Sequence, residues 1–180
     1  MEYWEAAKKE LGIDGAKFTL LYEDSESASN VAAFIQSEIE STLEGVTVEM
    51  QSVPKKVRIE NMQAGDFDIA LHRWGADYDD PNAFLSLYAS DRTASSNFGK
   101  WTSGEYDALL KEINTGDLAT KPEERWEACK ELERILIEDV GFMPLYQNGE
   151  ATLTRPGVAG MDYHFIGIEG IYRDLVKAAS

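Results

Sequence analysis

The chain has 180 residues with 17 basic and 33 acidic side chains, so its formal net charge at pH 7 is −16. Its length is enough for one globular domain, and its 43% of hydrophobic residues is too high for a disordered acidic chain. The acidity argues against a nucleic-acid partner and against docking on an anionic membrane, because both require a basic surface. The single cysteine, Cys129, excludes an internal disulfide and a thiolate-rich zinc site.

The first half of the chain predicts alternating helices and strands. Hydrophobic spacing and cap residues predict, in order, a helix over 2–11, a strand over 17–22, a helix from 25–29 to Gly45, a strand over 46–50, a helix from 52 to Gly65 and a strand over 67–71. This βαβαβ order indicates an α/β fold, with a parallel sheet core flanked by helices. Ligands of such sheets bind beyond the carboxyl ends of the strands, so the loops 23–26 and 73–80 are the expected ligand positions.

The second half is predicted to be more helical. Asp80 and Pro81 resemble the start of a helix, a second helix is predicted over 103–113, and the capping-box pattern 120–123 opens a long third one. The apolar stripe of the third helix is predicted to be Trp126, Cys129, Leu132, Leu136 and Val140. Segments 142–147 and 151–154 look like two strands around an Asn-Gly turn. No repeat or linker divides the chain, which predicts a single domain over 1–180.

Few residues suggest a catalytic or metal-binding site. The sequence has no nucleophile elbow, phosphate-binding loop, dinucleotide motif or HExxH motif, and its two histidines lie far apart. We therefore expect neither a cofactor nor a metal ion. Cys129 lies on an apolar helix stripe, which favours a buried, inert thiol.

The dense carboxylate cluster is Asp77, Asp79 and Asp80, at a predicted ligand position. A calcium loop, a catalytic carboxylate pair and simple turn or cap residues are the alternatives. Asp77 differs from the other two because Trp74 and Tyr78 flank it, and a carboxylate between aromatic rings suits an ammonium group.

The loop and its surroundings resemble the oligopeptide- and dipeptide-binding proteins of bacterial ABC transporters, the extracellular solute-binding proteins of family 5. The resemblance is carried by the segments Asp66-Phe67-Asp68-Ile69-Ala70, Trp74-Gly75-Ala76-Asp77-Tyr78-Asp79-Asp80-Pro81, Phe84-Leu85, Asn97, Tyr106-Asp107-Ala108-Leu109-Leu110 and Pro144-Leu145-Tyr146. It covers most of the chain, and the Trp74–Pro81 segment is its most specific part.

Members of this family are much longer and have two lobes that close on the peptide. The resemblance implies that residues 1–180 are a single α/β lobe, the C-terminal lobe of a periplasmic-binding-protein-like fold of type II. It implies the following partners: an oligopeptide, the permease subunits of an ABC transporter and the missing N-terminal lobe, on which segments after Gly160 would pack. The parent would be exported to the periplasm or held on the cell surface as a lipoprotein.

The resemblance also implies residue roles. The aspartate that matches Asp77 pairs with the α-amino group of the bound peptide. Trp74 and the backbone of Arg73, Gly75 and Ala76 would line the same wall, where backbone groups can pair with the ligand main chain. Such contacts accept many side chains, because every peptide shares the groups that they recognise.

Other implications stay open at this point. Tyr146 either faces the cleft or packs in the core, and Leu71 stands near the position where some members carry a basic residue for the peptide C-terminus. The predicted function is non-enzymatic capture of peptides, to which a lone lobe contributes only weak binding. The alternatives are a non-peptide solute such as nickel, a sugar or a signalling molecule, and a hydrolase that uses Asp77 with Asp79 or Asp80.

Overall fold

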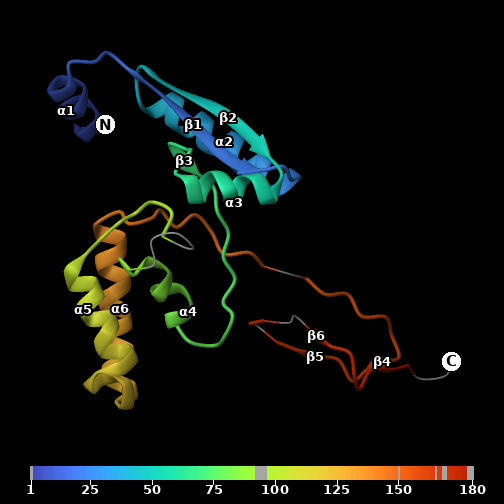
Figure 1. The fold of residues 1–180 in the computed structure, drawn as a ribbon. Helices are drawn as coiled ribbons and strands as arrows, with labels where there is room; N and C mark the ends of the chain where they lie inside the picture. Colours follow the sequence, from blue (N-terminus) through green and yellow to red (C-terminus); the bar gives the residue numbers. More distant parts are fainter. Residues whose placement is uncertain (1, 92–96, 150, 165, 168–169, 178–180) are drawn as a thin grey trace. The chain divides into compact units, whose positions relative to one another are not determined.

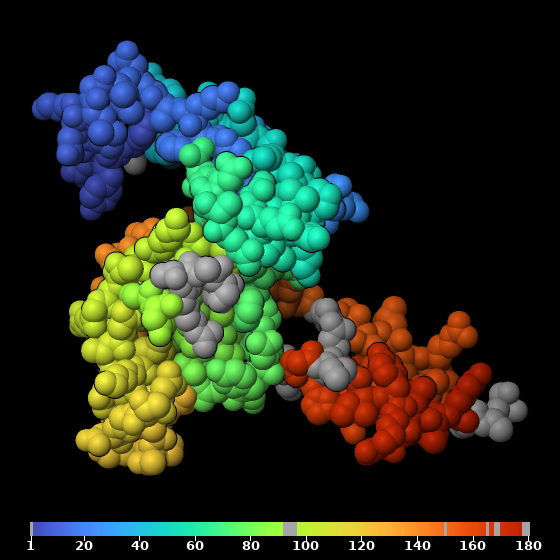
Figure 2. Space-filling view, in the orientation of Figure 1, coloured from blue at the N-terminus to red at the C-terminus, as the bar shows by residue number. Residues whose placement is uncertain are grey.

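The computed structural model describes residues 2–91, 97–149, 151–164, 166–167 and 170–177. The chain forms two compact units, Met1–Arg73 and Trp74–Ser180, called unit 1 and unit 2 below. In Figures 1 and 2, unit 1 runs from blue to green and unit 2 from green to red. That the two units make up a single lobe stays a prediction.

Unit 1 is built around a parallel β-sheet. Its elements are α1 (Glu2–Leu11), β1 (Ala16–Glu23), α2 (Glu26–Thr42), β2 (Val46–Val53), α3 (Lys55–Ala64) and β3 (Ile69–Ala70). The strand order is β2-β1-β3, and β1 pairs in parallel with both neighbours. The predicted βαβαβ unit is therefore confirmed (Figure 1).

The third strand is shorter than predicted. The sequence indicated a strand over 67–71, but the strand β3 covers Ile69 and Ala70, and the Leu71 N–H adds one backbone hydrogen bond to Leu21 of β1. Just before it, the Asp68 carboxylate accepts the Thr19 N–H at 2.8 Å. A side chain thus satisfies a donor of β1 that a longer ladder would have paired with backbone.

Local signals set the helix ends of unit 1. The Ser25 hydroxyl accepts the Ala28 N–H at the start of α2, and Gly65 ends α3 in the left-handed conformation with φ +76°. The core between the sheet and α2 includes the fully buried Leu20, Ala32 and Val48. The strands β1 and β3 therefore belong to a sheet that is packed against a helix, and their ends lead into the loops predicted to bind a ligand.

Unit 2 begins with helices. Its helical elements are α4 (Asn82–Leu85), the 3₁₀ turn η1 (Ser86–Tyr88), α5 (Gly104–Thr115), the 3₁₀ turn η2 (Asp117–Thr120) and α6 (Pro122–Glu138). The helix predicted over 103–113 begins one residue later, at Gly104, because Ser103 caps α5 through its hydroxyl.

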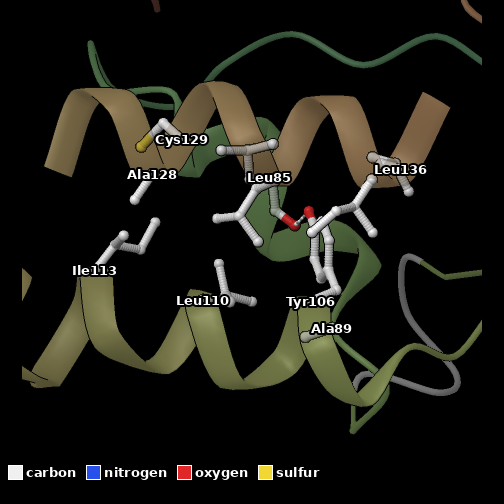
Figure 3. Close-up of a cluster of buried hydrophobic side chains, with 10 residues drawn as sticks. Leu85, Ala89, Tyr106, Leu110, Ile113, Ala128, Cys129 and Leu136 are labelled. Carbon is white, nitrogen blue, oxygen red and sulfur yellow. Dashed lines mark hydrogen bonds between the residues drawn. The ribbon is translucent and has the colours of Figure 1, made fainter. Parts of the chain in front are cut away.

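The core of unit 2 lies between α5 and α6, with the end of α4 packed against both (Figure 3). Tyr106 is fully buried there, and its hydroxyl donates a hydrogen bond of 2.7 Å to the Leu85 carbonyl oxygen. Cys129 is buried, as predicted, and burial raises the pKa of its thiol. This core ties the short α4 to the two longer helices.

Three details of α6 differ from prediction. The capping box is wrong: Thr120 belongs to η2, the cap is Lys121 without a side-chain hydrogen bond, and Pro122 is the first helical residue. Trp126 and Val140 are 53% and 73% exposed, because α6 ends at Glu138 and buries a different stripe. That stripe consists of Ala128, Cys129, Leu132, Ile135 and Leu136.

The predicted hairpin around Asn148 and Gly149 is wrong. In the described ranges 142–149 and 151–155 the chain forms no strand, and residues 143–149 and 151–155 are exposed. Alternating side chains do not make a strand unless another backbone pairs with it. The chain instead ends in two short antiparallel pairs, formed by β4 (Val158–Ala159) with β7 (Val176–Lys177) and by β5 (Asp162–Tyr163) with β6 (Gly170–Ile171).

None of the helices in the described part of the chain is both long and apolar enough to cross a membrane.

Candidate peptide-binding loop

The loop Trp74–Asp80 opens unit 2 and is tied to the helix that follows it. The Trp74 indole N–H donates to the Ala83 carbonyl oxygen at 3.2 Å. The Asn82 side-chain amide donates to the Tyr78 hydroxyl oxygen, also at 3.2 Å. Both aromatic side chains are nevertheless almost half exposed, so the loop presents them at the surface while their polar atoms bond to α4.

Asp77 lies between these two aromatic residues and is exposed. Its carboxylate has no ion pair or hydrogen bond with any other residue that the structure describes. An aspartate that served the fold would be expected to cap a helix or pair with a cation. Among the described residues Asp77 does neither, and its side chain is exposed to solvent.

Gly75 and Ala76 give the loop an accessible backbone. A side-chain carbon added at Gly75 would meet no atom within 4 Å. Within the described ranges, the backbone of residues 75–77 takes part in no hydrogen bond. A ligand main chain could therefore reach these groups, as the sequence analysis expected for Gly75 and Ala76. Arg73 is exposed at the end of unit 1, and its place at the site stays a prediction.

Asp80 has a different environment from Asp77. Its two carboxylate oxygens accept hydrogen bonds from Arg125 of α6 at 2.7 and 2.9 Å, and one of them also accepts the Asn82 N–H at 2.8 Å. The Arg125 guanidinium holds the pKa of Asp80 below its usual range. Asp80 thus fixes a turn, as the simplest sequence interpretation expected, and its cationic partner 45 residues away was not predicted.

Tyr146 does not lie on a strand. It is 55% exposed within the segment 142–149, so of the two alternatives left open by the sequence, packing in the core is wrong. Its orientation toward a cleft stays a prediction. Leu71 packs against the core of unit 1, and its correspondence to a basic position of the family stays a prediction.

A charged cluster that the sequence analysis missed lies at the end of the sheet in unit 1. Arg58 of α3 is 3% exposed, and its guanidinium bonds the Leu71 carbonyl oxygen and His72 Nδ1, both at 2.9 Å. It also forms an ion pair with Glu23 at 3.4 Å. The helical position of Arg58 gave no signal, because charged residues on helices mostly face solvent.

His72 is kept neutral in this cluster. Desolvation, followed by the nearby Arg58 guanidinium, lowers the pKa of His72 to about 4. Its neutral Nδ1 can then accept the hydrogen bond from Arg58. In the part of the chain that the structure describes, no group of three or more histidine, cysteine or acidic side chains could hold a metal ion.

Comparison with known proteins places this fold and loop in a family. A model of the bacterial extracellular solute-binding proteins, family 5 (middle part), matches residues 1–96. A dipeptide-binding protein of Lactococcus lactis subsp. cremoris (strain MG1363) is 32% identical over 170 residues, which are 93% of this chain and 30% of the relative.

Solved structures agree with that match. The substrate-binding domain of an oligopeptide ABC transporter from Bacillus anthracis str. Ames superposes with a TM-score of 0.85 at 32% identity, covering 99% of this chain and 34% of the other. Listeria monocytogenes OppA bound to peptide gives a TM-score of 0.82 at 30% identity, with 99% and 33% covered.

This chain therefore belongs to the bacterial extracellular solute-binding proteins of family 5. The resemblance noted in the sequence and the periplasmic-binding-protein-like α/β fold are both confirmed. The chain spans only about a third of the length of its relatives, 30% of the Lactococcus protein and 34% of the Bacillus structure.

Proposed function

We propose that this chain is part of the peptide-binding component of a bacterial ABC importer, in which Asp77 pairs with the α-amino group of the peptide. The observation that carries the proposal is the exposed Asp77 carboxylate, which lacks an internal cation among the described residues and lies between Trp74 and Tyr78. The names of the relatives support it, because they are dipeptide- and oligopeptide-binding proteins.

The rest of the loop suits a ligand with a peptide main chain. The backbone of residues 75–77 is open to added hydrogen bonds, and the side chains of Trp74 and Tyr78, which flank Asp77 in the sequence, expose apolar surface. A charge-assisted contact to the ammonium group should contribute about 1.5–3 kcal/mol. That is about one to two decades of affinity.

The remaining parts of the proposal follow from the family. Binding would be completed by the N-terminal lobe, through closure of two lobes around the peptide. The bound peptide would pass to the permease subunits, without chemical change, outside the cytoplasm. Periplasmic relatives, such as the murein peptide-binding protein MppA of Escherichia coli, support this location.

Two alternatives make distinct predictions. A hydrolase would need a second tuned carboxyl group, but Arg125 holds Asp80 ionised and engaged, which disfavours Asp80 as a general acid. A non-peptide solute would be detected by native mass spectrometry of the purified full-length gene product. A bound peptide mass supports the proposal, and a sugar or metal mass contradicts it.

Asp77→Asn in the full-length gene product tests the role of the carboxylate. Isothermal titration with a mixture of tetra- and pentapeptides should show affinity lower by about one to two decades, because the charge-assisted contact is lost. Asp79→Asn is the matched control, since it removes the same charge from an exposed neighbour in the same loop. Equal losses in both variants would contradict a specific role for Asp77.

A further inference from the structure

The loop that presents Asp77 is anchored at both ends. At its start, the Trp74 indole bonds the Ala83 carbonyl oxygen of α4. At its end, Asp80 caps the Asn82 N–H and bonds Arg125 through both carboxylate oxygens. Asp77 lies three residues from each anchor, so its position depends on both.

Arg125 joins this loop to the core of unit 2. Its guanidinium bonds Asp80 through both terminal nitrogens, while its Nε donates to the Ile113 carbonyl oxygen near the end of α5 at 3.1 Å. One side chain of α6 therefore connects the end of the loop to a second helix of the same core.

The geometry of the Arg125–Asp80 ion pair restricts the two side chains more than that of a solvent-exposed ion pair would. The Arg125 and Asp80 side chains are 22% and 29% exposed, and the bidentate arrangement restricts both distance and orientation. By contrast, Arg134 lies later on α6 and is half exposed, and within the described ranges its partners are Glu131 and Glu138 of its own helix. Such surface pairs along one helix hold no other segment in place.

We propose that Arg125 is a positioning residue, which fixes Asp77 for the peptide ammonium group by holding Asp80. The inference rests on the proposed function of Asp77 and adds to it the residue that keeps the recognising carboxylate in place. Arg125 itself contacts no ligand in this account. It acts on Asp77 indirectly, by holding Asp80 and the turn that leads into α4.

The test compares a free peptide with its N-acetylated form in the full-length gene product. Arg125→Gln should weaken the free peptide by about threefold to tenfold, less than Asp77→Asn, because the carboxylate remains and only its placement changes. The N-acetylated peptide should bind almost unchanged. A loss of folded protein would weaken the binding of both peptides equally. The ratio of the dissociation constant of the N-acetylated peptide to that of the free peptide therefore separates an effect on positioning from an effect on stability.

Control variants sharpen this test. Arg134→Gln removes a paired arginine from the same helix and should leave the ratio unchanged. The double variant Asp80→Asn/Arg125→Gln should be no worse than either single variant, since both remove the same anchor. Hydrogen exchange of the unliganded protein should be faster at residues 80–85 in Arg125→Gln but not in Arg134→Gln.

The outcomes separate the two proposals. If Asp77→Asn lowers the ratio but Arg125→Gln leaves both the ratio and the exchange at 80–85 unchanged, the positioning role is overturned and the function stands. If Asp77→Asn leaves the ratio unchanged, the proposed function is overturned, and the role of Arg125 in it with it.

Discussion

Two charged side chains, one in each unit, have opposite environments. Arg58 in unit 1 is buried, and its guanidinium is held by Glu23, the Leu71 carbonyl oxygen and His72. Asp77 in unit 2 is exposed, and among the described residues its carboxylate has no partner. Arg58 lies on the helix before β3 and Asp77 in the loop after it, and among the described residues Arg58 alone of the two is paired with an opposite charge.

This difference predicts a structural role for the charge of Arg58 and a binding role for that of Asp77. A buried ion costs several kcal/mol to desolvate, so Arg58 must keep its partners for unit 1 to fold. An exposed carboxylate costs little to leave unpaired and contributes little to stability. A substitution at Arg58 should therefore damage the fold, and one at Asp77 should damage binding alone.

The largest effect on stability is expected from Arg58→Met. The methionine fills much of the space but leaves Glu23 and the Leu71 carbonyl oxygen without their donor, which should lower the free energy of unfolding by about 3 kcal/mol. Urea denaturation of the 180-residue chain measures this loss. Lys56→Met on the same helix is the control, since that side chain is 87% exposed. Similar losses in the two variants would show that the cluster does not stabilise unit 1.

A smaller, pH-dependent effect is expected from His72. Its pKa is lowered from 6.5 to about 4 in the folded chain, so the unfolded chain binds more protons between these values. Stability should then fall as the pH drops from 6.5 to 4. The loss should reach about 1 kcal/mol, which allows for the partial exposure of the ring.

His72→Gln tests the direction of this pH dependence of stability. The variant should lose less stability than the natural chain over the same pH range, whereas His164→Gln, at a histidine of unit 2 outside the Arg58 cluster, should follow the natural chain. Urea denaturation at about pH 7, 5.5 and 4, a series that spans the unfolded-state and folded-state pKa values of His72, gives the comparison. A steeper fall in His72→Gln would mean that protonated His72 is favoured in the fold.

The smallest effect on stability is expected from Asp77→Asn. Because its carboxylate has no internal partner among the described residues, the free energy of unfolding should change by less than about 0.5 kcal/mol. The same denaturation experiment measures it, with Arg58→Met as the opposite extreme. A loss comparable to that of Arg58→Met would place Asp77 among the residues that hold the fold.

Local sequence predicted much of the fold. Ser25 and Ser103 cap helices, and Gly65 ends one, because these signals act over a few residues. The βαβαβ order was predicted correctly for the same reason, since hydrophobic spacing is a property of each segment. The position of Asp77 on an exposed loop after β3 followed from that order.

Contacts between distant residues were not predictable from spacing. The partner of Asp80 lies 45 residues away at Arg125, and Glu23 and Arg58 are 35 residues apart. The Asp68 carboxylate just before β3 bonds the Thr19 N–H from 49 residues away, which no alternation of side chains reveals. The segment 142–149 has the pattern of a strand, but its own sequence cannot supply the neighbouring backbone that a strand requires.

The most direct test of the central claim is a double-mutant cycle between Asp77 and the peptide amino group in the full-length gene product. Free and N-acetylated forms of one peptide are titrated against the natural protein and Asp77→Asn. The account predicts a coupling free energy of about 1.5–3 kcal/mol, because each change removes the same charge-assisted contact. Additive losses, with no coupling, would contradict the claim that Asp77 binds the peptide ammonium group.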